Sequence, residues 1–318
     1  MTEIAAAPRG SKIPTGTGRR GDKIFSRLST AAGVLILVML AGVALFLVAE
    51  AWPAVTADQA DLPDQKSLLA YTGPLIYGTV LAAVLALLFA VPVALGIALF
   101  ISHYAPRRLA QGLGYAVDLL AAIPSVVYGL WGIFFLAPQV KPAYAWLADH
   151  LSFIPFFAGP ASVTGRTILS VGIVLAVMIL PIMTAICREV FLQTPRLHEE
   201  AALALGATRW EMIRMTVLPY GRSGIVSAAM LALGRALGET MAVALLLSVG
   251  GGVSLNLITN QNPATIAANI ALKFPESSGV LVNALIFTGL VLFVITFLVN
   301  LAARAFLARR SEFSGANG

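Results

Sequence analysis

The chain has 318 residues, of which 58% are hydrophobic and only 11% are charged, and its mean hydropathy is +0.88. Soluble domains carry about 25% charged residues, so this composition excludes an ordinary soluble protein and indicates an integral membrane protein. The net charge of +6 could suggest nucleic-acid binding. However, the basic residues are spread along loops without an aromatic–basic patch, so we expect no nucleic-acid partner. The single cysteine, Cys187, lies in an apolar run and excludes an internal disulfide.

The N-terminal region predicts a tail followed by a first membrane span. Residues 1–27 are rich in Gly, Thr, Pro and basic residues without apolar periodicity, which predicts a disordered cytoplasmic tail. Residues 28–49 are uncharged and long enough to cross the hydrocarbon layer. This run exceeds the apolar core of about 7–15 residues in a signal peptide, so we expect a retained span. Residues 28–70 therefore form the first span and an extracytoplasmic segment.

Five more apolar runs complete the predicted membrane topology. The third apolar run is interrupted by Asp118 and Pro124, and Pro92 is expected to kink the helix of the second run. Aromatic residues between 138 and 166 indicate an interfacial segment, and a glycine-led loop at 250–279 holds a short helix at 263–272. The sequence thus predicts an all-α protein with six transmembrane helices. Spans two to six are expected at residues 71–102, 113–136, 167–187, 223–249 and 277–303.

Basic residues predict the orientation of these spans. Six spans place both termini on one side, and the loops on that side hold most of the 21 Lys and Arg residues. The loops of the opposite side hold only Lys66, Lys141, Arg166 and Lys273. Because basic loops stay in the cytoplasm, both termini are predicted to be cytoplasmic, and so are residues 307–318 and the polar interruption at residues 194–219.

The polar interruption reads as two short helices, which we call the elbow (residues 194–219). Thr194 is the expected N-cap of the first helix, with Pro195 at the first helical position. Gly206 is expected to end this helix in a left-handed turn. Glu199 and Glu200 lie away from the apolar face. That face is formed at helical spacing by Leu197, Ala201 and Leu205.

The second helix of the elbow carries its own start and stop signals. Thr208 and Glu211 have the spacing of a capping box, and Pro219 is expected to close the helix. The expected apolar stripe consists of Trp210, Ile213 and Val217. Local chemistry therefore predicts a rigid helix–glycine–helix elbow between two spans.

One arginine lies within a predicted span. Arg235 and Glu239 are four residues apart near the middle of the fifth span, so on a helix they would share one face and could pair. A mid-membrane arginine costs about 2.5–3.5 kcal/mol and must face protein, water or a partner. Two interpretations remain open: a salt bridge that fixes packing, or a transport path in which the guanidinium binds an oxyanion. Gly234 and Gly238 would allow close helix approach on the same face.

The elbow also resembles a known motif. Glu200, Ala201, Ala202, Gly206 and the closing Pro219 resemble the EAA loop of membrane subunits of ATP-binding-cassette importers. The departure is a threonine at 216, where the family often has isoleucine. The resemblance implies a type I importer permease fold over a core at residues 71–306. It also implies that the elbow is a coupling helix seated on a cytosolic ATPase.

A closer resemblance covers nearly the whole chain, from residue 21 to residue 304. Residues 234–243 (GRALGETMAV), 122–129 (AIPSVVYG) and 21–25 (GDKIF) resemble phosphate importer permeases of the PstC type. The resemblance implies inorganic phosphate as substrate and a multi-pass protein of the bacterial inner membrane. The implied partners are a PstA-type permease, two PstB-type ATPases and an extracytoplasmic phosphate-binding protein. In that family an intramembrane arginine and glutamate are implicated in function, and Arg235 and Glu239 match them.

The sequence argues against an enzyme. No glycine-rich phosphate loop ending in Lys-Ser/Thr is present, so ATP-Mg must be bound and hydrolysed by a partner, and this chain is expected to bind no cofactor. His103, His150 and His198 lack metal-ligand spacing and lie outside the spans, which leaves an intramembrane serine hydrolase without its base. The alternatives that stay open are an importer of another oxyanion and an ion-coupled secondary transporter.

Overall fold

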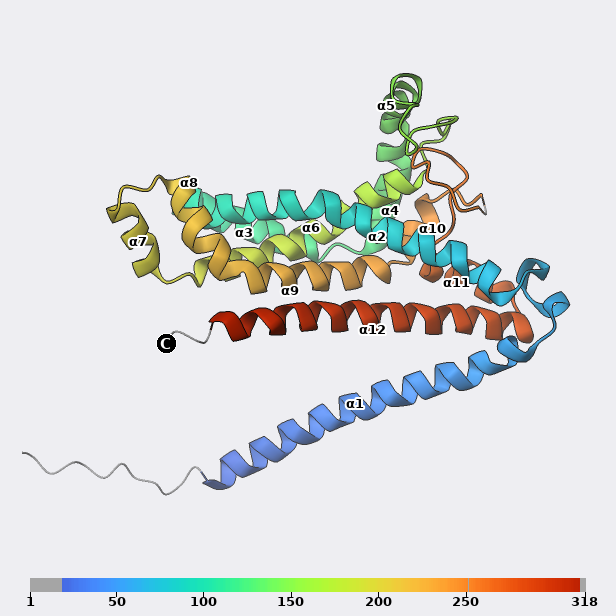
Figure 1. The fold of residues 1–318 in the computed structure, drawn as a ribbon, viewed down its shortest axis with the longest axis horizontal. Helices are drawn as coiled ribbons and strands as arrows, with labels where there is room; N and C mark the ends of the chain where they lie inside the picture. Colours follow the sequence, from blue (N-terminus) through green and yellow to red (C-terminus); the bar gives the residue numbers. More distant parts are fainter. Residues whose placement is uncertain (1–18, 251, 315–318) are drawn as a thin grey trace, which may run out of the picture. The chain divides into compact units, whose positions relative to one another are not determined.

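The computed structural model describes residues 19–250 and 252–314, and within them the chain is almost entirely helical (Figure 1). The only β pairing among these residues is an isolated bridge between Val249 and Asn262. Three of the short segments, η3, η4 and η5, are π-helical, and the other η segments are 3₁₀ helices. In chain order the helical segments are α1 (Arg19–Thr56), η1 (Gln59–Asp61), η2 (Pro63–Gln65), α2 (Leu68–Leu99), η3 (Phe100–Tyr104), α3 (Arg107–Ala121), α4 (Ser125–Trp131), η4 (Gly132–Leu136), α5 (Ala137–His150), α6 (Ile168–Leu192), α7 (Arg196–Ala204), α8 (Arg209–Met212), η5 (Ile213–Val217), α9 (Leu218–Leu237), α10 (Met241–Leu246), α11 (Ile266–Lys273), η6 (Phe274–Glu276) and α12 (Val280–Ser314).

The chain divides into two units, residues 1–49 and 50–318. The first unit holds the predicted first span, and residues 28–49 are helical as expected. Helix α1 already begins at Arg19, so the prediction of a disordered tail is wrong for residues 19–27, while residues 1–18 lie outside the described part. The early start has a local cause, because Asp22 lies in the first turn, where a carboxylate complements the helix dipole.

The second unit is built on long helices that pack along one another. Helix α2 packs along α6, and α6 packs against α9. Figure 1 shows the elbow helices α7 and α8 at one end of these three helices, with α10 and α11 toward the other end. Small residues allow the close approach, since five buried alanines recur at every fourth position of α2: Ala82, Ala86, Ala90, Ala94 and Ala98.

Four helices in the described part of the chain are long and apolar enough to cross a membrane. They are Gly21–Thr56, Leu68–Tyr104, Ile168–Leu192 and Val280–Ala305. These match the predicted first, second, fourth and sixth spans. A fifth crossing is added if a bent helix pair counts as one span. Six crossings and two cytoplasmic termini therefore stay predictions.

The predicted third span is not a single helix. Helix α3 ends at Ala121, and a second helical run, Ser125–His150, leaves it at an angle of 92°. Pro124 causes the break, because it disfavours helical geometry in the residue before it and sits at the N-cap of α4 with an extended backbone. The same run continues through α5, so the segment predicted to be interfacial is helical as far as His150.

The loop between α10 and α12, which is predicted to be extracytoplasmic and is called here the outer loop, is fastened to α2. Thr79 Oγ1 accepts a hydrogen bond from the backbone N–H of Ile266 at 2.9 Å. Asn269 Nδ2 donates to the hydroxyl of Tyr71 at 2.7 Å. The predicted short helix in this loop is confirmed as α11, and it is tied to the end of α2 opposite the elbow (Figure 1).

Candidate functional site

The first half of the elbow is a helix that ends in a glycine turn. Helix α7 runs from Arg196 to Ala204, and Gly206 follows with φ of +88°, so the predicted left-handed turn is confirmed. The predicted N-cap is displaced by one residue, because Pro195 occupies that position and Thr194 is buried in the preceding turn. Since proline at the cap cannot offer a side-chain acceptor, α7 begins without a side-chain cap.

The second half of the elbow begins with the predicted capping box. The hydroxyl of Thr208 accepts from the backbone N–H of Glu211 at 3.3 Å, and the Glu211 carboxylate accepts from the backbone N–H of Thr208 at 2.8 Å. The backbone and hydroxyl hydrogen bonds from Thr208 lower the pKa of Glu211 below its ordinary value. The box therefore fixes the geometry of the turn after Gly206.

Pro219 does not close the second helix, contrary to the prediction. Helix α8 passes through the π-helical segment η5 directly into α9, with Pro219 in the first turn of α9. A π-helical turn already interrupts the regular pairing, so the missing N–H of a proline is tolerated there. Thr216, the departure from the EAA pattern, donates to the carbonyl of Met212 at 2.7 Å within this segment. The elbow is thus joined to α9 without a break.

The two faces of α7 differ. Ala202 is only 6% exposed and packs into a buried cluster formed by α2, α6, α9 and the second elbow helix. Leu197 is 78% exposed and Leu205 is 89% exposed, so the predicted apolar face is directed away from the protein body. Glu200 is exposed as well, whereas its neighbour Glu199 is half-buried. The two adjacent glutamates therefore lie in different surroundings, one at the protein body and the other on the exposed face.

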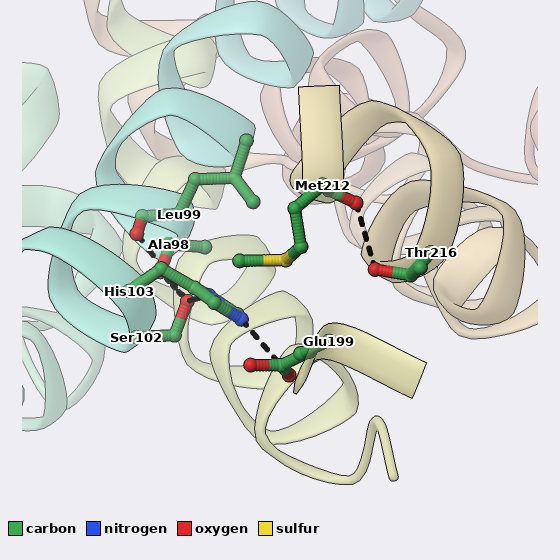
Figure 2. A network of polar contacts seen from close by, with 7 residues as sticks. All are labelled: Ala98, Leu99, Ser102, His103, Glu199, Met212 and Thr216. Carbon is green, nitrogen blue, oxygen red and sulfur yellow. Dashed lines mark hydrogen bonds and ion pairs between the residues drawn. The ribbon is translucent and has the colours of Figure 1, made fainter. Parts of the chain in front are cut away.

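A polar cluster joins the elbow to the end of α2. Figure 2 shows His103 and Glu199 pointing toward one another, with Nε2 of the histidine 3.5 Å from Oε1 of the glutamate. The other ring nitrogen of His103 lies 2.7 Å from Oγ of Ser102, which itself lies 2.8 Å from the carbonyl oxygen of Ala98. Sequence spacing gave no sign of this contact, because 96 residues separate the histidine from the glutamate.

Arg235 and Glu239 are not paired in the described structure. Helix α9 ends at Leu237, so the two residues do not share one helix face as the spacing had predicted. Gly238 follows the last helical residue, and Glu239 is buried with Oε1 accepting from the backbone N–H of Ala242 at 3.1 Å. The carboxylate thus supports the start of α10 instead of neutralising the arginine. The prediction of one continuous fifth span is also wrong.

Arg235 instead lines a hollow of about 540 Å³ between α6, α9 and α12. Ser227 of α9, together with Asn300 and Arg304 of α12, contributes polar groups to its wall. Among the side chains of residues 21–250 and 252–305, no carboxylate lines the hollow and neither arginine has an ion-pair partner. Sequence analysis singled out only Arg235 as an arginine within a span, so it missed the second guanidinium, which Arg304 supplies. The one signal in the sequence was the spacing of Asn300 and Arg304, which are four residues apart and therefore lie on the same face of α12.

The remaining candidates, a metal site and Cys187, form no functional site among the described residues. Within the described ranges no group of three or more His, Cys, Asp or Glu residues is placed to hold a metal ion. Cys187 is fully buried in α6, as expected for a small packing residue.

The apolar spans, the bent and broken helices and the helical elbow define a multi-pass membrane protein. The fold is similar to the crystal structure of a bacterial ABC transporter involved in the import of the acidic polysaccharide alginate, with a TM-score of 0.60 and 17% identity. That comparison covers 92% of this chain and 97% of the solved one.

The sequence comparisons identify the family. The model of the binding-protein-dependent transport system inner membrane component matches residues 90–312, and the chain belongs to this family. It is 47% identical to the phosphate transport system permease protein PstC 2 of Mycobacterium tuberculosis, over 96% of this chain and 97% of that protein. It is 42% identical to the phosphate transport system permease protein PstC of Mesorhizobium japonicum, covering 93% and 92% of the two chains. The predicted resemblance to PstC-type permeases is confirmed.

Proposed function

We propose that this chain is a membrane-spanning permease subunit of an ATP-driven phosphate importer in the bacterial plasma membrane. It would form half of the translocation pathway beside a PstA-type permease, above two PstB-type ATPases, and would receive phosphate from an extracytoplasmic binding protein. The names of the full-length relatives support phosphate as the substrate. The observation that carries the proposal is Arg235, which lines the hollow beside α9 without an ion-pair partner among the described side chains.

The chemistry of the hollow favours an anion. A charged side chain at membrane depth costs about 2.5–3.5 kcal/mol, so it is retained where it meets water or a ligand. Arg235 and Arg304 add two positive charges to one cavity, and none of its described lining residues is a carboxylate. A guanidinium offers a planar fork of donors that matches two oxygens of a phosphate, and Ser227 and Asn300 add neutral hydrogen-bonding groups. Within this proposal Glu239 positions the helix break beside Arg235.

The shape of the elbow favours coupling to an ATPase. The outer face of α7 presents Leu197, Leu205 and Glu200, and exposed leucines on a cytoplasmic helix are typical of a surface that a partner covers. Ala202 lets the helix lie close to its neighbours, Ala201 lies on the exposed face with the two leucines, and Gly206 sets the turn. Closure of the ATPase subunits would move the elbow, and the unbroken path through Pro219 would carry the motion into α9, toward a gate at Arg235.

Uptake of radiolabelled phosphate tests this proposal. We expect a strain that lacks its own importer to take up phosphate when this chain is produced with its partner subunits, and to lose uptake when ATP is depleted. Excess sulfate or molybdate should not compete. Competition by either ion would indicate an importer of another oxyanion. Uptake by this chain alone, driven by an ion gradient, would indicate a secondary transporter and contradict the proposal.

A further inference from the structure

The contact between His103, at the end of α2, and Glu199 of α7 has no role in the proposed function. It is the only side-chain polar contact that joins α7 to another helix within the described residues. Both partners are largely shielded, since the His103 side chain is 10% exposed and the Glu199 side chain is 23% exposed. An exposed surface pair contributes little, but a shielded pair is screened less by water and salt.

The neighbouring hydrogen bonds indicate which atom donates in the contact between His103 and Glu199 (Figure 2). The hydroxyl of Ser102 has one hydrogen, which it donates either to the carbonyl of Ala98 or to Nδ1 of His103. In the first case the ring is protonated on both nitrogens, and in the second it is neutral with its hydrogen on Nε2. The remaining tautomer would aim a lone pair at a carboxylate, which is repulsive. Nε2–H therefore donates to Glu199 in both stable arrangements.

Packing reinforces the same joint. Ala202 lies three residues after Glu199 on α7, so both side chains face the body of the protein. Ala202 packs into the buried cluster that includes Ala98 and Leu99 of α2, beside His103. An apolar contact and a polar contact thus hold α7 against one helix end.

The far end of α2 is also fastened. Thr79 and Tyr71 bind α11 as described above, and the hydroxyl of Tyr77 donates to the carbonyl of Ser254 at 2.9 Å. Helix α2 is therefore tied to the elbow at one end and to the outer loop at the other. A movement of α7 would reach the outer loop through this helix without passing through α6 or α9.

We propose that His103 and Glu199 are positioning residues that make α2 move together with the elbow during each transport cycle. The inference rests on the proposed function, because it assigns a second route for the motion that ATP produces. The pair remains in contact as α7 moves, and α2 carries the displacement toward the outer loop. Neither residue contacts phosphate or ATP in this account.

A double-mutant cycle in the complete transporter tests the inference. Proteoliposomes are loaded with the purified complex, and inorganic phosphate uptake and ATP hydrolysis are measured on the same sample. We expect His103→Asn and Glu199→Gln each to lower the phosphate moved per ATP about two- to fivefold while the subunits still co-purify and hydrolyse ATP. The double variant should be no worse than the more impaired single variant. The exchanged pair His103→Glu/Glu199→His should regain most of the loss.

Control variants separate this inference from the proposed function. Glu189→Gln removes an exposed carboxylate of α6, close to the elbow in sequence, and should leave the ratio unchanged. Effects that add in the double variant, without recovery in the exchanged pair, would overturn the inference while a working wild-type complex upheld the proposed function. A wild-type complex that moves no phosphate would overturn both.

A tether covers the case in which the single variants fail to assemble. In His103→Cys/Glu199→Cys, a short reversible thiol cross-linker would hold the two positions together. Cys187, the only native cysteine of this chain, is buried and should not react. Because the pair is expected to move as one, the tethered complex should keep phosphate uptake near the untethered level. Loss of uptake on tethering, restored by reduction, would show that the two helices must separate and would refute the inference.

Discussion

Substitution of Gly206 tests the elbow at its most sensitive position. The residue joins α7 to α8 with φ of +88°, and a Cβ placed there would meet nothing within 4 Å. The effect of a substitution must therefore come from the backbone conformation and not from crowding inside this chain. An L-residue in the left-handed region costs about 1–2 kcal/mol, and asparagine costs less because it visits this region more readily.

These costs predict a ranked series. A penalty of about 1–2 kcal/mol shifts the population of the native elbow by a factor of about 5–30. We expect Gly206→Asn to retain most ATP-dependent phosphate uptake, Gly206→Ala to lose about 5–30-fold, and Gly206→Val to lose at least as much, because β-branched residues are stiffer. Membrane insertion and subunit assembly should be unchanged, since the spans keep their contacts.

The assay is phosphate uptake in proteoliposomes, with ATP hydrolysis and co-purification of the subunits measured on the same complexes. Normal uptake by Gly206→Val would refute the coupling role of the elbow. If asparagine proves as harmful as valine, the loss follows side-chain size, and the backbone argument would be wrong.

Three further predictions concern other regions. Arg235→Gln should abolish phosphate uptake while the complex assembles and hydrolyses ATP, and Arg235→Lys should recover only part, since it keeps the charge without the planar fork; a complex that falls apart would indicate a packing role. Gly78→Ala should lower thermal stability by about 1–3 kcal/mol, because its Cβ would lie 2.5 Å from a loop carbonyl oxygen, whereas Gly73→Ala on the same helix meets nothing within 4 Å and should be silent in a thermal unfolding assay. The lowered pKa of Glu211 means that its ionised form stabilises the elbow above the ordinary carboxyl pKa, and that this contribution is lost as the pH falls through the lowered value. The protection of α8 amides, after correction for the intrinsic exchange rate at each pH, should therefore fall at acidic pH. Thr208→Ala should lower this protection at neutral pH by removing a cap worth about 1 kcal/mol; unchanged protection in that variant would show that the capping box does not hold the turn.

Signals encoded by local chemistry were predictable from the sequence. The left-handed turn at Gly206 and the capping box of Thr208 and Glu211 each follow from a residue type at a fixed spacing, and the structure confirms both. Apolar length alone located the helices of the four clear spans, since hydrocarbon thickness dictates it.

Features that depend on partners in space were not predictable. The apolar spacing of Leu197 and Leu205 gave a face but not its direction, because outward exposure depends on what the rest of the protein covers. The spacing of Arg235 and Glu239 implied one continuous helix, yet the helix ends at Leu237 and the glutamate binds backbone instead. Pro219 looked like a helix end because a sequence pattern does not show a π-helical turn.

The central claim is that a cytosolic ATPase binds the outer face of α7. A photo-reactive amino acid in place of Glu200, in membranes that hold the complete complex, tests it most directly, because this exposed residue lies on that face. The account predicts an efficient cross-link to the nucleotide-binding subunit whose yield changes when ATP is bound. Labelling of this position by an impermeant reagent from the outside of intact cells, or a cross-link to lipid alone, would contradict it.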